Sequence, residues 1–266
     1  MQRAPSTPLA AALGTELAPP AAAPAPALDF SIHSQPDDET CGPTCLTAVY
    51  HYFHDPLPFA QVSQEIPRLR DGGTLACLLA CHALQRGYRA RLYTYDMKTF
   101  DPTWLVGRHE RLPQKLRQQM DVKADPKLHH VSQAYLRYLE LGGEIKFEDL
   151  SRALIRRPLL KGLPIIAGLS STYLYREMRD VPSTNETDDL RGLPGGHFVV
   201  LHGYRPLHGG TVLVADPYGN NPLTGSNEYE IPIDRVICAI LLGIVTYDAN
   251  LLILEPRRSA KKKNPV

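Results

Sequence analysis

The sequence predicts an α+β fold with two layers, a helical half followed by a half built on an antiparallel sheet. Three observations lead to this class. An apolar-periodic helix begins at Cys41, a β-rich strand begins at His197, and a neighbouring strand ends at Asp216. The helical periodicity and the strand-like composition therefore place three reactive side chains, Cys41, His197 and Asp216, at the ends of predicted elements from separate parts of the chain.

The first predicted helix begins at Cys41, with the amide side chain of Gln35 six residues before it. Pro43 suits the first helical turn, where its missing N–H costs nothing. The unpaired N–H groups and positive dipole of a helix start would stabilise both a thiolate and a developing oxyanion. Cys41 is therefore a candidate nucleophile. One buried stripe is formed at i, i+3, i+4 and i+7 by Leu46, Val49, Tyr50 and Phe53.

The middle of the chain supplies further elements of the helical half. Gly87 would end a helix over 74–86, Gly142 would end a helix over 127–141, and Pro158 would stop a helix over 147–157. Strands are predicted over 88–95 and 164–169.

A second segment supplies a candidate base and acid. The run from His197 to Tyr204 reads as a strand entered through a diglycine, and residues 209–215 read as its neighbour across a turn that contains Gly. Antiparallel pairing would bring His197 and Asp216 to the same edge of the sheet, where the carboxylate could orient the imidazole toward a thiol. Asp216 before Pro217 could instead simply open a β-turn.

Residues 231–254 are expected to add a helix over 236–242 and an edge strand over 251–254. The polar segment 170–194 directly precedes His197 and is either a lid or a plain surface insertion. Tyr173, Tyr175 and Arg176 within it suggest a peptide or amino-acid amide substrate. His202 lies five residues after His197, so strand alternation turns it to the opposite face, where a structural role is expected.

Three motifs together resemble the papain-like cysteine peptidases, in particular the double-glycine bacteriocin-leader peptidases and their stand-alone bacterial relatives. These motifs are Gln35 with Cys41-Gly-Pro-Thr, the run Gly196 to Tyr204, and Ala215-Asp216-Pro217, and the resemblance covers roughly residues 29–255. It implies a papain-like fold with four site residues in defined roles. These are Cys41 as nucleophile, His197 as base, Asp216 as the orienting acid and Gln35 as the oxyanion donor.

The resemblance does not extend to specificity. The leader peptidases are usually fused to a membrane ABC exporter, which is not found here, and a long insertion separates the helical half from the strand half. Neither double-glycine specificity nor an export role is therefore carried over from the resemblance.

Composition agrees with one globular unit. Of 266 residues, 43% are hydrophobic, which suffices for a single core over residues 29–256. The Ala- and Pro-rich residues 1–28 and the basic residues 257–266 are expected to be disordered tails. No apolar run reaches 18 residues, and a formal charge of +1 with interspersed signs offers no extended basic surface. We therefore expect neither membrane insertion nor nucleic-acid binding.

Five cysteines in a chain without a signal peptide favour free thiols and a reducing compartment, with the cytoplasm of a bacterium as the expected location. Two i, i+4 pairs, Cys41 with Cys45 and Cys77 with Cys81, would make a zinc site if they converged. Their helical, leucine-rich surroundings favour small buried hydrophobes instead, so no metal is expected.

The predicted function is hydrolysis of a peptide or amide bond through a thioester acyl-enzyme. No cofactor is required. An acyltransferase would use the same Cys-His-Asp triad, and a non-catalytic papain-like binding module is a further alternative. The sequence identifies no protein partner.

Overall fold

The computed structural model describes residues 27–69, 72–105, 111–184, 186–206 and 209–257. The predicted tails fall almost wholly outside these residues. The helices within them are α1 (Cys41–Tyr52), α2 (Phe59–Glu65), α3 (Ala76–Gln85), α4 (Leu112–Val122), α5 (Pro126–Glu140), α6 (Arg152–Leu159), α7 (Ser171–Tyr175) and α8 (Ile233–Leu242), with 3-10 turns η1 (Pro102–Leu105) and η4 (Gly243–Thr246).

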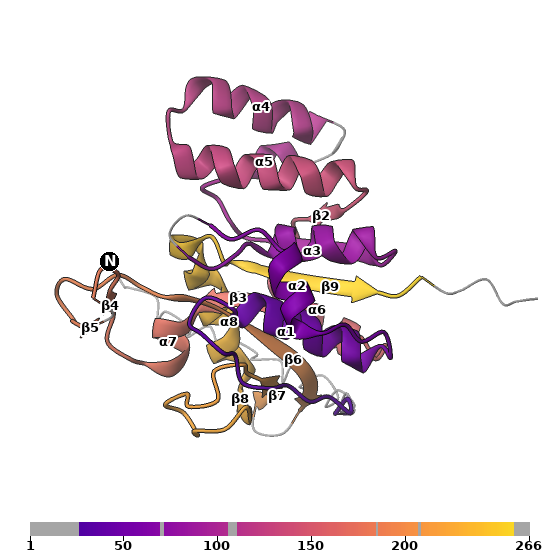
Figure 1. Ribbon diagram of the computed structural model, residues 1–266, viewed down its shortest axis with the longest axis vertical. Helices are drawn as coiled ribbons and strands as arrows, with labels where there is room; N and C mark the ends of the chain where they lie inside the picture. Colours follow the sequence, from indigo (N-terminus) through magenta and orange to yellow (C-terminus); the bar gives the residue numbers. More distant parts are fainter. Residues whose placement is uncertain (1–26, 70–71, 106–110, 185, 207–208, 258–266) are drawn as a thin grey trace, which may run out of the picture.

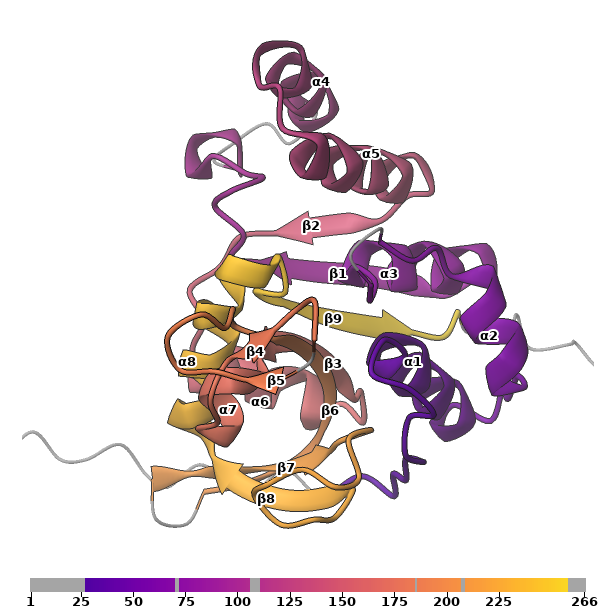
Figure 2. The same ribbon diagram turned by 60° about the vertical axis from the view of Figure 1, so that its left-hand side comes forward.

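A seven-stranded sheet forms the centre of the described fold, in the order β2-β1-β9-β3-β6-β7-β8. Only β1 and β2 pair in parallel, and the other neighbours are antiparallel. Figure 2 shows the sheet curling from β9 toward β7 and β8. Its strands are β1 (Arg89–Thr94), β2 (Glu144–Lys146), β3 (Ile165–Ser170), β6 (Gly196–Arg205), β7 (Thr211–Ala215), β8 (Glu228–Pro232) and β9 (Asn250–Glu255), and a separate hairpin joins β4 (Asp180–Val181) to β5 (Glu186–Thr187).

Strand β9 is central, which corrects the predicted edge strand over 251–254. It pairs with β1 on one side and β3 on the other. Leu252 belongs to the core on one face, whereas Leu251 and Ile253 belong to the core on the other. A continuous apolar run of this kind is typical of a strand that is buried on both faces.

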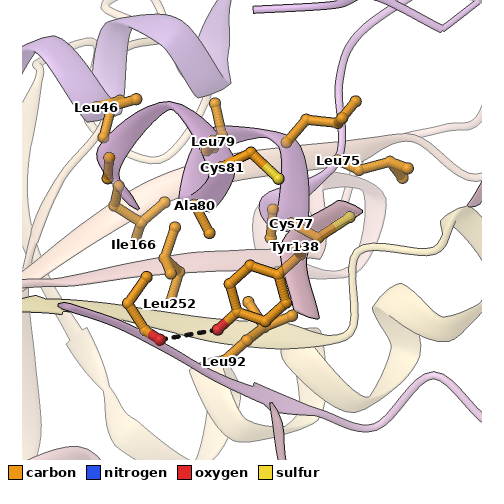
Figure 3. Close-up of a cluster of buried hydrophobic side chains, with 14 of the residues drawn as sticks. Leu46, Leu75, Cys77, Leu79, Ala80, Cys81, Leu92, Tyr138, Ile166 and Leu252 are labelled. Carbon is orange, nitrogen blue, oxygen red and sulfur yellow. Dashed lines mark hydrogen bonds between the residues drawn. The ribbon is translucent and has the colours of Figure 1, made fainter. Parts of the chain in front are cut away.

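One face of the sheet is covered by α1 and α3, with α5 packed beyond α3 (Figure 1). Figure 3 shows Leu46 of α1 and Leu79 of α3 facing Leu252 across this core, and the hydroxyl of Tyr138 donates to the Ala90 carbonyl at 2.9 Å. This face is the expected helical half, so the α+β class with Cys on helices and His and Asp on an antiparallel sheet is confirmed.

The other face is covered by α6, α7 and α8. The helix predicted over 147–157 is wrong in both bounds, because α6 begins only at Arg152 and includes Pro158. The hydroxyl of Ser151 accepts the Leu154 N–H and so caps the helix start. Pro158 is buried in the last turn, where its packing offsets the single lost backbone hydrogen bond.

Helices α4 and α5 form a hairpin in which α5 packs against α3 and α4 lies on its outer side (Figure 1). This is the insertion between the two halves, and α4 was not anticipated by the sequence patterns. Among the described residues, no helix has the length and apolar character needed to cross a bilayer.

Candidate active site

Cys41 is the first residue of α1 and is only 8% exposed. Thr40 precedes it as the N-cap residue, but its side chain does not cap the helix. The N–H groups at this helix start are therefore not claimed by a capping side chain. Gly42 fits against Thr74, whose methyl group would lie 2.7 Å from a Cβ at position 42.

The predicted hairpin between His197 and Asp216 is present. β6 and β7 pair antiparallel, with Val200 opposite Ala215, so Asp216 follows directly after the last paired residue. Nε2 of His197 and Oδ1 of Asp216 lie 2.8 Å apart. Both side chains are buried, and Asp216 is 0% exposed.

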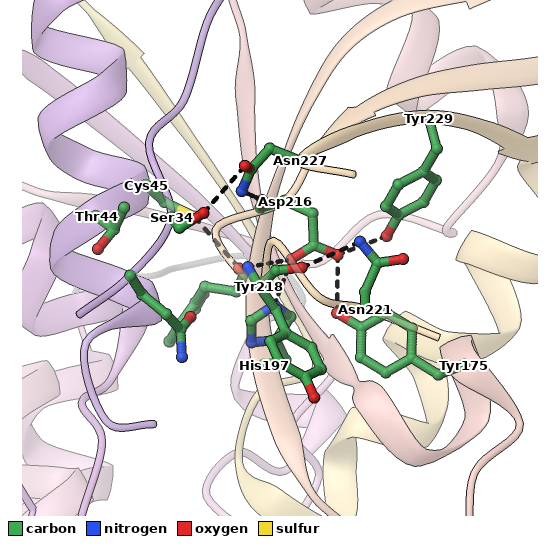
Figure 4. Close-up of polar contacts among 12 residues, drawn as sticks. Ser34, Thr44, Cys45, Tyr175, His197, Asp216, Tyr218, Asn221, Asn227 and Tyr229 are labelled. Atoms are coloured by element: carbon green, nitrogen blue, oxygen red, sulfur yellow. Dashed lines mark hydrogen bonds and ion pairs between the residues drawn. The ribbon is translucent and has the colours of Figure 1, made fainter. Parts of the chain in front are cut away.

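Three donors hold the Asp216 carboxylate besides His197. The hydroxyls of Tyr175 and Tyr229 donate to Oδ2 at 2.8 and 2.7 Å, and the Tyr218 N–H donates to Oδ1 at 2.9 Å (Figure 4). Burial works against the charged carboxylate, but His197 and these hydrogen bonds hold the pKa of Asp216 below its ordinary value. Burial and the Asp216 charge raise the pKa of both tyrosines, so the two hydroxyls stay protonated donors.

The backbone of Asp216 is fixed as well as its side chain. The Asp216 N–H donates to the Asn227 carbonyl at 2.7 Å, and Nδ2 of Asn227 donates to the Asp216 carbonyl at 2.7 Å. Ser34 in turn donates to Oδ1 of Asn227 at 3.1 Å. The sequence patterns identified none of these supporting roles.

The His197 ring is poised between Asp216 and Cys41. Since the ionised Asp216 only accepts, Nε2 of His197 is the donor in their bond, and Nδ1 is left for another partner. Cys41 lines the same cavity as His197. Burial lowers the pKa of His197, but Asp216 and Cys41 more than offset it and raise the pKa to about 10. The imidazolium form is thus favoured in this setting.

Gln35 lies beside the end of the same hairpin. Its backbone N–H donates to the Pro217 carbonyl at 2.8 Å. The side-chain Nε2 donates to the Asp37 carbonyl at 2.8 Å, which leaves the second N–H of the amide free of that bond. Oε1 is buried and has no hydrogen-bond partner among the described residues.

The other cysteines and His202 stand apart from this chemistry. The thiol of Cys45 donates to the Phe198 carbonyl at 3.3 Å. Burial raises the pKa of Cys45 and Cys77, and raises that of Cys81 to about 11. His202 is buried and stacks on Phe30 with ring centroids 5.7 Å apart. All five cysteines are free, and no cluster of three metal-ligating side chains occurs in the described part of the chain.

A cavity of about 620 Å³ opens onto the Cys41 and His197 side chains. Its walls come from the loop before α1, the loop before α3, the first turn of α5, the segment before β6 and the turn between η4 and β9. Four charged side chains line it: Asp38, Glu39, Lys127 and Asp248.

The segment 170–194 holds α7 and the β4–β5 hairpin, and it reaches the cavity through Pro182, Leu193 and Pro194. Tyr175 is buried beneath His197 instead of facing a substrate, and its ring centroid lies 6.1 Å from that of His197. Tyr173 is 39% exposed. Of the two tyrosines singled out in this segment, Tyr175 has its hydroxyl committed to Asp216 and Tyr173 is the one open to solvent.

A cysteine at a helix start beside a histidine–aspartate pair on an antiparallel sheet is a thiol-hydrolase arrangement. The chain belongs to the Peptidase_C39 like family, whose model matches residues 27–235. A cysteine-peptidase type of function follows from this membership.

Three solved structures are similar to the chain at low identity, and each aligns with 86% of it. A double-glycine-motif protease from an AMS/PCAT transporter, in complex with the leader peptide, is 17% identical, with 94% of its chain covered and a TM-score of 0.41. The peptidase domain of Streptococcus ComA, a bifunctional ABC transporter of a quorum-sensing pathway, is 14% identical, with 99% covered and a TM-score of 0.41. A protein described as a C39-like peptidase from Bacillus anthracis is 13% identical, with 96% covered and a TM-score of 0.43. No curated protein matches the sequence.

Proposed function

We propose that this protein hydrolyses a peptide or amide bond with Cys41 as nucleophile, His197 as general base and acid, and Asp216 as the orienting carboxylate. The observation that carries the proposal is the hydrogen bond between His197 and Asp216, which leaves the other ring nitrogen for Cys41. Three donors from three separate segments hold the Asp216 carboxylate of this bond, which a merely structural histidine does not need.

The first half-reaction forms a thioester. His197 takes the Cys41 proton, and the sulfur attacks the carbonyl carbon of the scissile bond to form a tetrahedral oxyanion. The imidazolium then gives its Nδ1 proton to the leaving amine, the C–N bond breaks, and the acyl group stays on Cys41. Asp216 keeps the ring oriented and stabilises its charge throughout this step.

The second half-reaction releases the acyl group. His197, now neutral, takes a proton from water as the water oxygen attacks the thioester carbon. Collapse of this second tetrahedral species breaks the C–S bond, releases the carboxylic acid and restores the thiolate–imidazolium pair. No cofactor takes part in these steps.

The Cys41 backbone N–H and the Gln35 side-chain amide are the proposed hydrogen-bond donors that stabilise the oxyanion. Cys41 is the first residue of α1, whose start no side chain caps, and the Pro217 carbonyl accepts the Gln35 backbone N–H beside the hairpin. The Gln35 amide retains an N–H that its bond to Asp37 does not use. Such donors matter only when negative charge develops on the substrate oxygen.

The test is Cys41-dependent cleavage of a complex peptide library by the full chain, with new amino termini identified by mass spectrometry. Cys41→Ala should abolish every new terminus, whereas Cys238→Ala, which removes an exposed cysteine, should cleave like the wild type. Cleavage that survives in Cys41→Ala would place the nucleophile elsewhere. If neither protein cleaves and no acyl group can be trapped on Cys41, the chain is a binding module.

Acyl transfer is distinguished in the same assay. Adding glycinamide at millimolar concentration should leave free carboxylates as the main products if water resolves the thioester. Glycinamide adducts in excess over free acids would show an acyltransferase instead.

The free cysteines favour a reducing compartment, and we propose the cytoplasm as the site of action.

A further inference from the structure

Asp248 is a buried carboxylate inside the candidate active-site cavity that the peptidase chemistry does not use. It lies in the turn between η4 and β9, is 7% exposed, and lines the same cavity as Cys41 and His197. Its backbone is fixed on both sides, since its N–H donates to the Gly243 carbonyl at 2.9 Å and its carbonyl accepts the Asn250 N–H at 2.7 Å. The side chain is therefore held in place beside the reacting groups.

The residue before His197 leaves room for this carboxylate. A Cβ at Gly196 would lie 1.9 Å from Oδ2 of Asp248 and 2.8 Å from the Thr246 hydroxyl. Any side chain at position 196 would thus displace Asp248 from the cavity wall. A glycine is therefore needed at position 196, because only a residue without a side chain lets the Asp248 carboxylate approach the backbone of β6.

The charge of Asp248 is incompletely compensated by its surroundings. Burial is the main effect on the Asp248 pKa and raises it to about 7, and the Asp96 charge also raises it. The hydrogen bond from Thr246 and the charges of Lys127 on α5 and His197 on β6 lower the pKa but do not cancel the effect of burial. The Lys127 ammonium lies 5.3 Å from the Tyr247 ring centroid. A carboxylate removed from water is costly unless a cation pairs with it closely.

Two more acidic side chains and one lysine, Lys127, line the rest of the cavity. Asp38 and Glu39 line it from the loop before α1, and Glu39 is shared with Arg68 at 3.1 Å. An incoming cationic group would therefore meet the exposed Asp38 carboxylate and the buried Asp248 carboxylate in the same cavity.

We propose that Asp248 is a specificity determinant that pairs with a cationic group of the peptide substrate, an ammonium or a guanidinium, close to the scissile bond. This inference rests on the proposed peptidase function and adds the substrate class. The group can belong to a Lys or Arg side chain or to a free amino terminus, and both present the same chemistry to the carboxylate.

The experiment measures the rate at which peptidyl acyloxymethyl ketones label Cys41 in the full chain. One set is amino-terminally acetylated and carries Lys, norleucine or Glu at each of the three positions before the warhead. A second set has the same sequences with a free amino terminus. The wild type should label about ten- to a hundredfold faster with Lys than with norleucine at one position, as one charge-assisted hydrogen bond would give. A preference seen only in the free-terminus set identifies the α-ammonium as the cation.

Asp248→Asn keeps the size and the backbone bonds and should abolish the preference for Lys while leaving the norleucine rate unchanged. Asp38→Asn removes an exposed charge of the same cavity and should reduce the preference much less. A uniform loss of rate with all probes in Asp248→Asn would mean that Asp248 acts through His197, and an equal effect of both variants would point to the general field of the cavity. Either result overturns the inference.

The wild type alone provides a second measurement, in case the variant is unstable. The ratio of Lys to norleucine labelling should rise as pH increases from 6 to 8, because the Asp248 pKa lies near 7. A flat ratio overturns the inference. Labelling of Cys41 without cation preference rejects it but leaves the peptidase intact, whereas failure of every probe to label Cys41 rejects both.

Discussion

The carboxylate of Asp216 accepts a hydrogen bond from Nε2 of His197 at 2.8 Å, and this contact leaves Nδ1 for the proposed nucleophile. With Nε2 committed, only Nδ1 can exchange a proton with Cys41. Oδ2 of the same carboxylate is held by two tyrosines, so the acid cannot rotate freely away from the ring. The following predictions test this arrangement.

Cys41 should be alkylated by iodoacetamide at neutral pH roughly tenfold or more faster than the exposed Cys238, although Cys41 is buried. The reason is the imidazolium beside it. His197→Ala should slow the labelling of Cys41 and leave that of Cys238 unchanged, which makes Cys238 an internal reference. Peptide mapping by mass spectrometry measures both rates, and equal labelling in the wild type would contradict the assignment.

Gln35→Ala should leave the alkylation of Cys41 intact, because no oxyanion forms in that reaction. Turnover of an acyl or peptide substrate should fall by about 10²- to 10³-fold, the usual effect of losing one oxyanion donor. Comparing the two rates on the same preparation separates this role from a general disturbance. If Gln35→Ala turned over substrate at the wild-type rate, Gln35 would have only a structural role in its turn.

Tyr229→Phe and Tyr175→Phe should each lower the free energy of unfolding by about 1.5–3 kcal/mol, since each removes a hydrogen bond to a buried charge. The Asp216 pKa should rise in both variants, so the acidic limb of Cys41 alkylation should move to higher pH. Tyr218→Phe is the matched control, because Tyr218 reaches Asp216 through its backbone N–H. Denaturant titration and a pH–rate profile provide the readouts.

The His197–Asp216 pair should make stability depend on pH in a defined direction. His197 has a folded-state pKa of about 10 against an ordinary 6.5, so its contribution is complete below pH 6.5 and is lost as pH rises toward 10. The pKa of Asp216 lies below its ordinary 3.8, so its contribution is complete above pH 3.8 and is lost in stronger acid.

The difference in unfolding free energy between the wild type and His197→Gln should therefore be largest between about pH 4 and 6.5, and should shrink by a few kcal/mol toward pH 10. Taking the difference largely cancels the titration of other groups. A difference that grows with pH would show that His197 is buried in its neutral form.

Gly196→Ala should destabilise the fold, because its Cβ would overlap Oδ2 of Asp248. Truncating the acid should relieve the clash, so Gly196→Ala should cost less in an Asp248→Ala background. A double-mutant cycle of unfolding free energies measures this coupling. Additive effects would mean that the backbone of β6, not Asp248, imposes the glycine.

The sequence predicted the elements that carry strong local signals. Leu46, Val49 and Tyr50 of the predicted stripe are buried as expected, whereas Phe53 follows the helix end and is only half-buried. The diglycine, the β-rich run from His197 and the turn containing Gly placed β6 beside β7 correctly. These features depend on neighbours in sequence. The proximity of Cys41 to His197 could be inferred only from the order of the motifs and their family resemblance.

Features that depend on distant contacts were missed. Tyr229 and Tyr175 carry no local pattern that points to Asp216. Their hydrogen bonds to Asp216 form only when β8 pairs with β7 and α7 packs against the sheet. Asp248 sits in a turn that reads as ordinary loop sequence. Strand β9 was placed at an edge because its apolar run does not say which strands flank it.

The position of β9 affects when the protein can first become active. β9 follows every other strand in sequence, yet it lies between β1 and β3 and joins the two parts of the sheet. Its pairing with β1 spans more than half of the chain, and such distant pairing forms slowly because a long loop must close first. During synthesis, the helix that bears Cys41 and the hairpin that bears His197 therefore emerge from the ribosome before the strand that unites the sheet. A nascent chain would hold Cys41 and His197 without the completed cavity between them until β9 has been translated.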